Sequence, residues 1–132
     1  MARHYTFGKK ERLKSRKSIE TLFQTGRRFS AGNFRVLYLF KTEAALAAGT
    51  GVSSRLFKKA VDRNRVKRLT REAWRLQKQP LDEKLKSSGK GLHVFFIFTT
   101  NKLPDFLDVN TVMAGIVKRL LKELNENPAP DS

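Results

Sequence analysis

The segment LHVFFIFTT, residues 92–100, constrains the fold more than any other part of the chain, because nearly all of its first seven side chains are apolar. A strand with apolar side chains on both faces belongs inside a sheet that is covered on both sides. The apolar run is about a third of the length that a helix needs to cross a bilayer. It therefore predicts a central, buried strand in a soluble protein.

A second segment, residues 27–41, predicts a pair of strands with a turn near Ala31-Gly32-Asn33. Side chains alternate between the two faces of a strand. One face of the second strand then carries Phe34, Val36, Tyr38 and Phe40, and the other carries Arg35, Leu37, Leu39 and Lys41. Neither set is plainly polar, so we expect both faces to be at least partly covered.

Amphipathic helices are predicted near both ends of the chain. The first spans residues 15–26, with Ser15 or Ser18 as its N-cap and Gly26 at its end. The last begins at Asp108 as its N-cap. Its apolar stripe, spaced for one face of a helix, consists of Val109, Val112, Met113, Ile116, Leu120 and Leu124.

The middle of the chain completes the predicted order. We expect a connection at residues 42–49 and a third strand at 50–57. A long helix at 59–79 is expected to end before Pro80, and a polar loop at 80–91 follows it. The order α-β-β-β-α-β-α predicts an α+β fold with a single sheet of about four strands and helices packed on it. Residues 1–132 then form one domain, made of a basic flexible arm, a folded part and a disordered tail at 1–11, 12–124 and 125–132.

The charge balance indicates a polyanionic partner. The chain has 28 Lys+Arg against 12 Asp+Glu, a formal net charge of +16. An excess of this size is typical of proteins that bind nucleic acid or an anionic membrane surface. The absence of cysteine excludes disulfides, thiol catalysis and Cys-based zinc sites, and it fits an intracellular protein. His4 and His93 lack ligand-spaced partners, and no catalytic carboxylate pair or nucleotide-binding glycine loop is present.

The segment RNRVKRLTREAWR, residues 63–75, concentrates this charge on one predicted helix. Arg63, Lys67, Arg71 and Arg75 follow one another at i+4 steps, and Arg68 lies beside them. Their mutual repulsion costs roughly 1 kcal/mol in the isolated helix. A separate apolar face is formed by Val66, Leu69, Ala73 and Leu76. A phosphate backbone removes the repulsion and releases counterions, so the pattern favours RNA or another polyanion over a merely solvated face.

The segment AVDRNRVKRLTREAW, residues 60–74, resembles the signature of the bacterial ribonuclease P protein subunit: Arg-Asn-Arg, then a Lys-Arg pair, then Arg-Glu. ERLKSRKSIETLFQTGRRF, residues 11–29, is similar to the opening helix of that family, and FRVLYL, residues 34–39, to its second strand. The resemblance covers residues 10–124. The chain departs from the family pattern in SSRLFKKAV, residues 53–61, where Leu56 replaces one basic position.

The resemblance implies a left-handed β-α-β crossover and a cytoplasmic ribonucleoprotein that cleaves precursor tRNA at its 5′ end. In that family the chemistry is carried by an RNA subunit with Mg²⁺ bound mainly by RNA, so no catalytic residue, metal ligand or other cofactor is expected in the protein. The positions that match the RNA-subunit-binding residues are Arg63, Asn64, Arg65, Lys67, Arg68, Arg71 and Arg75. Those that match a cleft for the single-stranded 5′ leader are Arg12, Lys14, Ile19, Phe23, Tyr38 and Arg55.

Alternatives remain open at this point. For Phe23 ordinary core packing is as consistent with the sequence as a cleft, whereas the Tyr38 hydroxyl favours a partly wet site. Asn64 fits a local hydrogen bond as well as an RNA contact. A non-catalytic RNA-binding protein of the ribosomal type explains the charge but not the Arg-Asn-Arg signature. A peripheral membrane binder fits poorly, and neither a membrane nor DNA is an expected partner.

Overall fold

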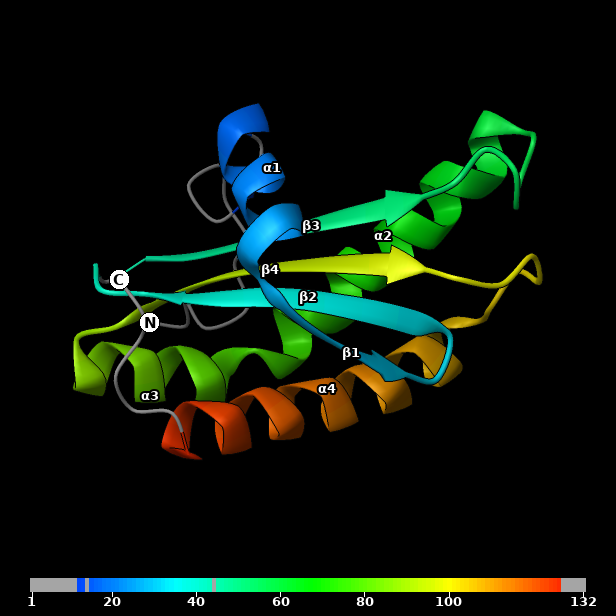
Figure 1. Ribbon diagram of the computed structural model, residues 1–132. Coiled ribbons are helices and arrows are strands. Elements are labelled where there is room, and N and C mark those ends of the chain that lie inside the picture. The colour runs from blue at the N-terminus through cyan, green and yellow to red at the C-terminus, as the bar shows by residue number, and fades with distance from the viewer. Residues whose placement is uncertain (1–11, 14, 44, 127–132) are drawn as a thin grey trace.

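The computed structural model describes residues 12–13, 15–43 and 45–126, so the predictions for the arm at 1–11 and for residues 127–132 of the tail lie outside the described residues. Eight elements follow one another along the chain (Figure 1): α1 Arg16–Thr25, β1 Arg27–Ala31, β2 Phe34–Lys41, β3 Leu46–Val52, α2 Ala60–Gln77, α3 Gln79–Ser88, β4 Gly91–Phe98 and α4 Phe106–Glu126. The α+β class and the four-stranded sheet are confirmed.

The four strands form one mixed sheet in the order β1-β2-β4-β3. β1, β2 and β4 pair antiparallel, and β3 lies parallel to β4. The predicted central strand is confirmed, since β4 has a neighbour on each side. Its middle residue Phe95 lies opposite Leu37 on one side and Gly49 on the other. The turn between β1 and β2 is also as predicted, with Gly32 at φ +54°.

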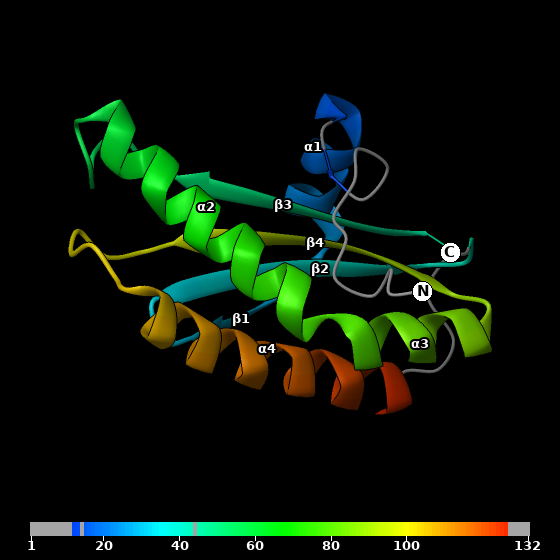
Figure 2. The same cartoon turned by 180° about the vertical axis from the view of Figure 1, so that it is seen from behind.

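Helices cover both faces of the sheet. α1 lies on one face, and α2, α3 and α4 lie on the other, as the two opposite views show (Figures 1 and 2). Two apolar clusters fill the two interfaces. The larger contains the even-numbered side chains of β2 and β4 with α2, α3 and α4. The smaller packs under α1 and consists of Leu13, Leu22, Leu37 and Ala47, with Ile19, Leu39, Phe95 and Ile97 partly buried around them.

The connection from β3 through α2 and α3 to β4 is left-handed. In Figure 2, α2 lies in front of the sheet, β3 and β4 both point to the left, and β3 lies above β4. Parallel β-α-β connections are almost always right-handed, so this handedness is a distinguishing feature of the fold.

One helix was missed by the sequence analysis, which predicted a polar loop at 80–91. α3 forms there because proline is well accommodated in the first turn of a helix, where its missing N–H has no intrahelical partner. Leu81 and Leu85, one turn apart, are both buried against the core. Gly89 ends the helix at φ +68°, and its N–H donates to the carbonyls of Leu85 and Lys86.

Two boundaries also differ from the prediction. The third strand was predicted at 50–57 but spans Leu46–Val52, because small buried residues such as Ala47 and Ala48 fit beside β4 although alanine is uncommon in strands. The N-cap of α4 is Asp105 rather than Asp108: the Asp105 carboxylate accepts a hydrogen bond from the Asp108 N–H at 2.8 Å. α4 continues to Glu126, two residues into the predicted tail.

Both predicted ends of α1 are confirmed. Ser15 is the N-cap, and its hydroxyl accepts from the Ser18 N–H at 3.3 Å. Gly26 ends the helix, as predicted. Within the part of the chain described above, no helix combines the length and the apolar character needed to cross a membrane.

Candidate nucleic-acid interface

α2 has an inner face that packs on the sheet and an outer face that carries charge. The buried side chains are Val66, Thr70, Ala73 and Trp74, and the Trp74 ring lies 5.3 Å from that of Phe96. The Thr70 hydroxyl donates to the Val66 carbonyl at 2.8 Å, which satisfies the polar atom in this apolar setting. The buried face of α2 thus differs slightly from the predicted one: it includes Thr70 and Trp74, whereas Leu69 and Leu76 are only half-buried.

Arg63, Lys67, Arg71 and Arg75 form the predicted basic ridge, and the two residues at its ends, Arg63 and Arg75, bind within the protein. The Arg63 guanidinium donates to the carbonyls of Phe57 at 2.7 Å and Lys58 at 2.9 Å, so it holds the loop that enters α2. Arg75 pairs with Glu72, with Nε 3.2 Å from Oε1 and a second contact to Oε2. The hydrogen bond from Arg75 is the main reason why the pKa of Glu72 is lowered. The ridge is thus less uniformly repulsive than its sequence spacing suggests.

The middle of α2 presents the remaining cations. Arg65 and Arg68 are exposed, and Lys67 and Arg71 are half-buried. Among the residues that the structure describes, none forms an ion pair or hydrogen bond with the side chains of these four residues. We call Arg65, Lys67, Arg68 and Arg71 the basic centre of α2. Asn64 is exposed beside them.

The other surface of interest lies beside α1. Phe23 projects from α1 and is 40% exposed as a residue, and its ring meets that of Phe95 edge-on at 5.4 Å. Phe95 in turn lies against Gly49 and Gly51, where an added Cβ would come within 2.7 Å and 2.9 Å of its ring. Ile19 packs on the same cluster. The two aromatic rings, with bare glycine backbone next to them, form a partly exposed platform that we call the Phe23–Phe95 platform.

Phe23 and Ile19 were predicted for this surface from the sequence, whereas Phe95, Gly49 and Gly51 were not. The alternation within 92–98 places Phe95 on the same face as His93 and Ile97. The contact of Phe95 with two glycines, however, follows from the register between β3 and β4. This register pairs Phe95 with Gly49, which is 46 positions away in the sequence. Arg35, opposite Ile97, adds an exposed cation to the same face and was also missed.

Tyr38 does not belong to this surface, which corrects the prediction that it lines a cleft with Phe23. It shares its face of β2 with Val36 and Phe40, opposite to the face that α1 covers, and only 3% of it is exposed. Its ring contacts those of Phe29 and Phe40. Burial, together with the neighbouring Glu123 carboxylate, raises the pKa of Tyr38. The hydroxyl thus has a protein partner in α4 instead of a wet site.

The basic residues predicted for the same cleft are spread over different places. Arg12 lies at the edge of β3, where it forms an isolated bridge with Ala48. Arg55 is exposed on the turn that follows β3, where its N–H donates to the Ser53 hydroxyl at 3.1 Å. Lys14 lies outside the described residues. Arg55 thus lies on the connection between β3 and α2, and Arg12 lies along the free edge of β3.

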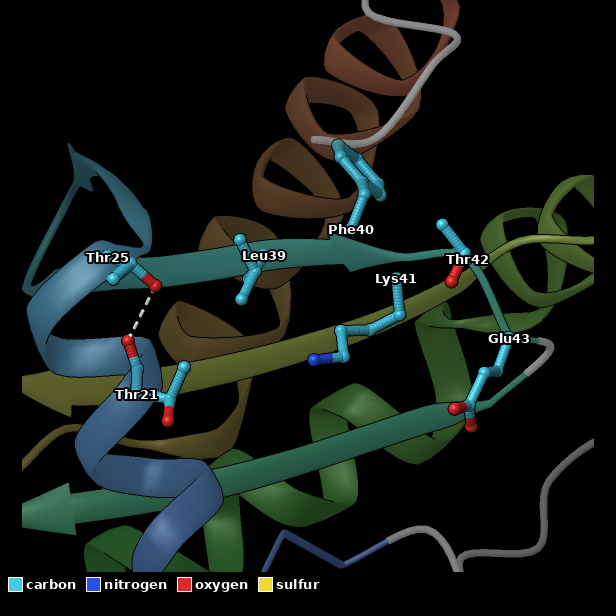
Figure 3. A pocket seen from close by; sticks show the side chains of 7 residues that line it. All are labelled: Thr21, Thr25, Leu39, Phe40, Lys41, Thr42 and Glu43. Carbon is cyan, nitrogen blue, oxygen red and sulfur yellow. Dashed lines mark hydrogen bonds between the residues drawn. The ribbon is translucent and has the colours of Figure 1, made fainter. Parts of the chain in front are cut away.

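The opposite flank of α1 borders a separate pocket of about 550 Å³ (Figure 3). Thr21 and Thr25, one turn apart on α1, line it together with Leu39, Phe40, Lys41, Thr42 and Glu43. Lys41 extends toward α1 in this view, and the Thr25 hydroxyl donates to the Thr21 carbonyl at 2.8 Å. Close by, burial and then the Lys41 charge lower the pKa of His93. The pocket lies apart from both Phe23 and α2.

The described residues, 12–13, 15–43 and 45–126, contain no group of three or more His, Cys, Asp or Glu side chains that could hold a metal ion. The two surfaces described above offer guanidinium and ammonium groups, which bind phosphates, and aromatic rings, on which bases can stack.

These features define a class of protein: a small basic α+β domain with a left-handed crossover helix whose basic centre lacks ion-pair and hydrogen-bond partners within the described chain. Comparison with known proteins identifies the family. The sequence model described as Ribonuclease P matches residues 7–121, so the chain belongs to the ribonuclease P protein family.

Relatives and solved structures agree with this assignment. The chain is 39% identical to the ribonuclease P protein component of Porphyromonas gingivalis over 120 residues, which cover 87% of this chain and 88% of the relative. It is 32% identical to that of Clostridioides difficile, covering 86% and 94%. The solved RNase P protein of Thermotoga maritima matches with a TM-score of 0.57 at 25% identity, covering 83% of this chain and 96% of that one. The Staphylococcus aureus RNase P protein shares the fold, with a TM-score of 0.57 at 21% identity.

Proposed function

We propose that this protein is the protein subunit of ribonuclease P, which binds the catalytic RNA subunit and the 5′ leader of precursor tRNA and so promotes maturation of the tRNA 5′ end. The observation that carries the proposal is the basic centre of α2, four cations without partners in the described chain, on a member of this family. The proposed setting is the bacterial cytoplasm.

The basic centre is the proposed contact with the RNA subunit. Three of its four members are arginines, whose planar guanidinium groups bind phosphates through paired hydrogen bonds. Each phosphate that is neutralised releases counterions, which makes the affinity strongly salt-dependent. Arg63 and Arg75 act here mainly as supports, because one holds the loop before α2 and the other pairs with Glu72.

The Phe23–Phe95 platform is the proposed contact with the single-stranded leader. Bases of single strands stack on aromatic side chains within positively charged surfaces, largely without regard to sequence. Phe23 supplies a partly exposed ring, and Arg35 supplies a cation on the same side of the sheet. Tyr38 is not part of this proposal, since it is buried on the other face.

The hydrolysis itself is assigned to the RNA subunit. Mg²⁺ would supply the activation of water and the stabilisation of developing charge. The described residues offer no carboxylate or imidazole cluster for such an ion, so the magnesium is proposed to be held mainly by RNA. The protein would act by positioning the substrate and by neutralising phosphate repulsion in the assembled complex.

Cleavage assays with a bacterial ribonuclease P RNA and a precursor tRNA test the proposal. At low magnesium concentration, the protein is expected to raise the rate of correct 5′ cleavage well above that of RNA alone. Arg65→Ala is expected to weaken this stimulation, and Lys84→Ala, an exposed cation on α3 away from α2's basic centre, serves as the control. RNA binding without any stimulation of cleavage would instead favour a structural RNA-binding protein and would refute the proposed function.

A further inference from the structure

Along the chain, α1 and three of the four strands lie between Arg12 and α2. In space, however, the position of Arg12 at the edge of β3 directs its side chain toward that helix. The Leu13 N–H donates to the Ala48 carbonyl at 2.9 Å, and Arg12 forms a parallel bridge with Ala48. Residues 12 and 13 therefore continue the sheet beyond β3 as a short extended segment.

Alternation along this segment decides which way each side chain points. Leu13 is buried in the cluster under α1, together with Leu22 and Leu37. In extended backbone the preceding side chain points to the opposite face, so Arg12 is directed to the side on which α2 lies. Ala48, its bridge partner, agrees with this, because it belongs to the core on the α2 side.

On that side α2 packs directly against β3. Arg68 and Arg71 are neighbours on α2 at i,i+3 spacing, and Arg71 is half-buried. The electrostatics agree with a close approach of the three groups: burial, then the charge of Arg12, then that of Arg68 lower the pKa of Arg71. Three guanidinium groups from two distant segments thus share one region of the surface, and their repulsion opposes folding of the free protein.

We propose that Arg12, Arg68 and Arg71 together form one phosphate-binding site that joins the N-terminal segment to α2 and takes a phosphodiester of the structured RNA bound by α2. This inference rests on the proposed function and deepens it. It assigns Arg12 to the RNA-subunit surface, whereas the family resemblance implied the leader surface. A bound phosphate converts the repulsion among the three groups into attraction to a common anion.

The position of the site gives it a second role. Ser15, the N-cap of α1, is two positions after Leu13 in the sequence, and α1 carries Phe23. A phosphate held between Arg12 and α2 therefore fixes the start of the helix that presents the Phe23–Phe95 platform. The site connects the surface for the RNA subunit with the surface for the leader.

Binding to a bacterial ribonuclease P RNA, without tRNA, tests the inference. Arg12→Ala is expected to weaken binding about tenfold, the loss that corresponds to one charge-assisted hydrogen bond. It should also make the dependence of log K on log salt shallower by up to about one unit. Arg12→Lys keeps the charge but not the guanidinium fork, so it should keep the salt slope while recovering only part of the affinity. Lys17→Ala, an exposed cation on α1, is the matched control and should change little.

A double-mutant cycle identifies the shared phosphate. If Arg12 and Arg71 hold the same anion, the double alanine variant loses less affinity than the product of the two single losses. Thermal unfolding of each variant without RNA separates a loss of binding from a loss of folding stability.

Three outcomes would overturn the inference. The first is that the affinity losses of Arg12→Ala and Arg71→Ala multiply in the double variant. The second is that Arg12→Ala weakens RNA binding no more than Lys17→Ala does. The third is that Arg12→Ala weakens binding only when a leader-bearing substrate is present. Arg65→Ala in the same assay keeps the two proposals apart. If it weakens RNA binding while Arg12→Ala does not, only the three-arginine site is wrong; if neither variant nor the wild-type protein binds specifically, the proposed function fails.

Discussion

Replacing Phe23 by alanine removes the exposed ring of the Phe23–Phe95 platform. Because the residue is already 40% exposed and makes one edge-on ring contact at 5.4 Å, the loss of folding stability should be about 1–2 kcal/mol, less than the roughly 3–5 kcal/mol for a fully buried phenylalanine. The loss of binding free energy for the leader should be at least as large as this loss of folding stability. One stacked base contributes about 1–3 kcal/mol, so affinity should fall about 5- to 150-fold.

The assay compares two substrates on the reconstituted complex: precursor tRNA with its 5′ leader, and mature tRNA without one. Phe23→Ala should weaken binding of the first and leave the second unchanged. Phe23→Leu is the informative control, since it keeps apolar packing on Phe95 but offers no ring for stacking, and it should reproduce most of the loss with less effect on stability. Equal losses on both substrates, or full affinity in Phe23→Leu, would show that the ring does not stack on the leader.

Three further predictions concern α2, α3 and α4. Arg65→Ala should reduce RNA-subunit affinity and make its salt dependence shallower by up to about one unit in binding titrations between low and moderate salt; an unchanged slope would mean that Arg65 contacts no phosphate. Leu85→Ala should cost about 2–5 kcal/mol in chemical denaturation, because Leu85 is buried and holds α3 on the core; a change within error would contradict that packing. Burial acts to raise the pKa of Glu123, but hydrogen bonds from Arg119 and Tyr38 outweigh it and the pKa is lowered. Glu123 therefore stabilises the fold above its unfolded pKa and loses this contribution as pH falls through its lower folded pKa. In thermal melts below about pH 5, Glu123→Gln should flatten this acid dependence, and an unchanged profile would contradict it.

Local patterns predicted most of the elements because their causes are local. Ser15 and Gly26 mark the ends of α1 through capping chemistry that involves only near neighbours. The central position of β4 follows from its own apolar composition, which suits no exposed strand. The failures also have local explanations. Pro80 suggested an end to helical structure, whereas it occupies the first turn of α3, and alanine-rich 46–48 suggested a connection although its small side chains suit a strand beside β4.

The candidate interface was predictable only in part. Helical spacing correctly placed the cations of α2 on a side separate from its apolar residues. It did not distinguish Arg63, which binds two loop carbonyls, or Arg75, which pairs with Glu72, from the basic centre between them. For Tyr38, the alternation along β2 put it with Phe34, Val36 and Phe40, but only the placement of the helices shows which face α1 covers.

Charge, periodicity and capping are properties of neighbouring residues, so they are enough to predict a basic α+β protein with one amphipathic, arginine-rich helix. The tertiary structure alone decided how distant segments meet. It sets Phe95 against Gly49 and Gly51, puts Tyr38 under α4, and brings Arg12 beside Arg68 and Arg71. These juxtapositions depend on sheet register, strand order and crossover handedness, which arise from contacts between residues far apart in the chain and leave no trace in local periodicity.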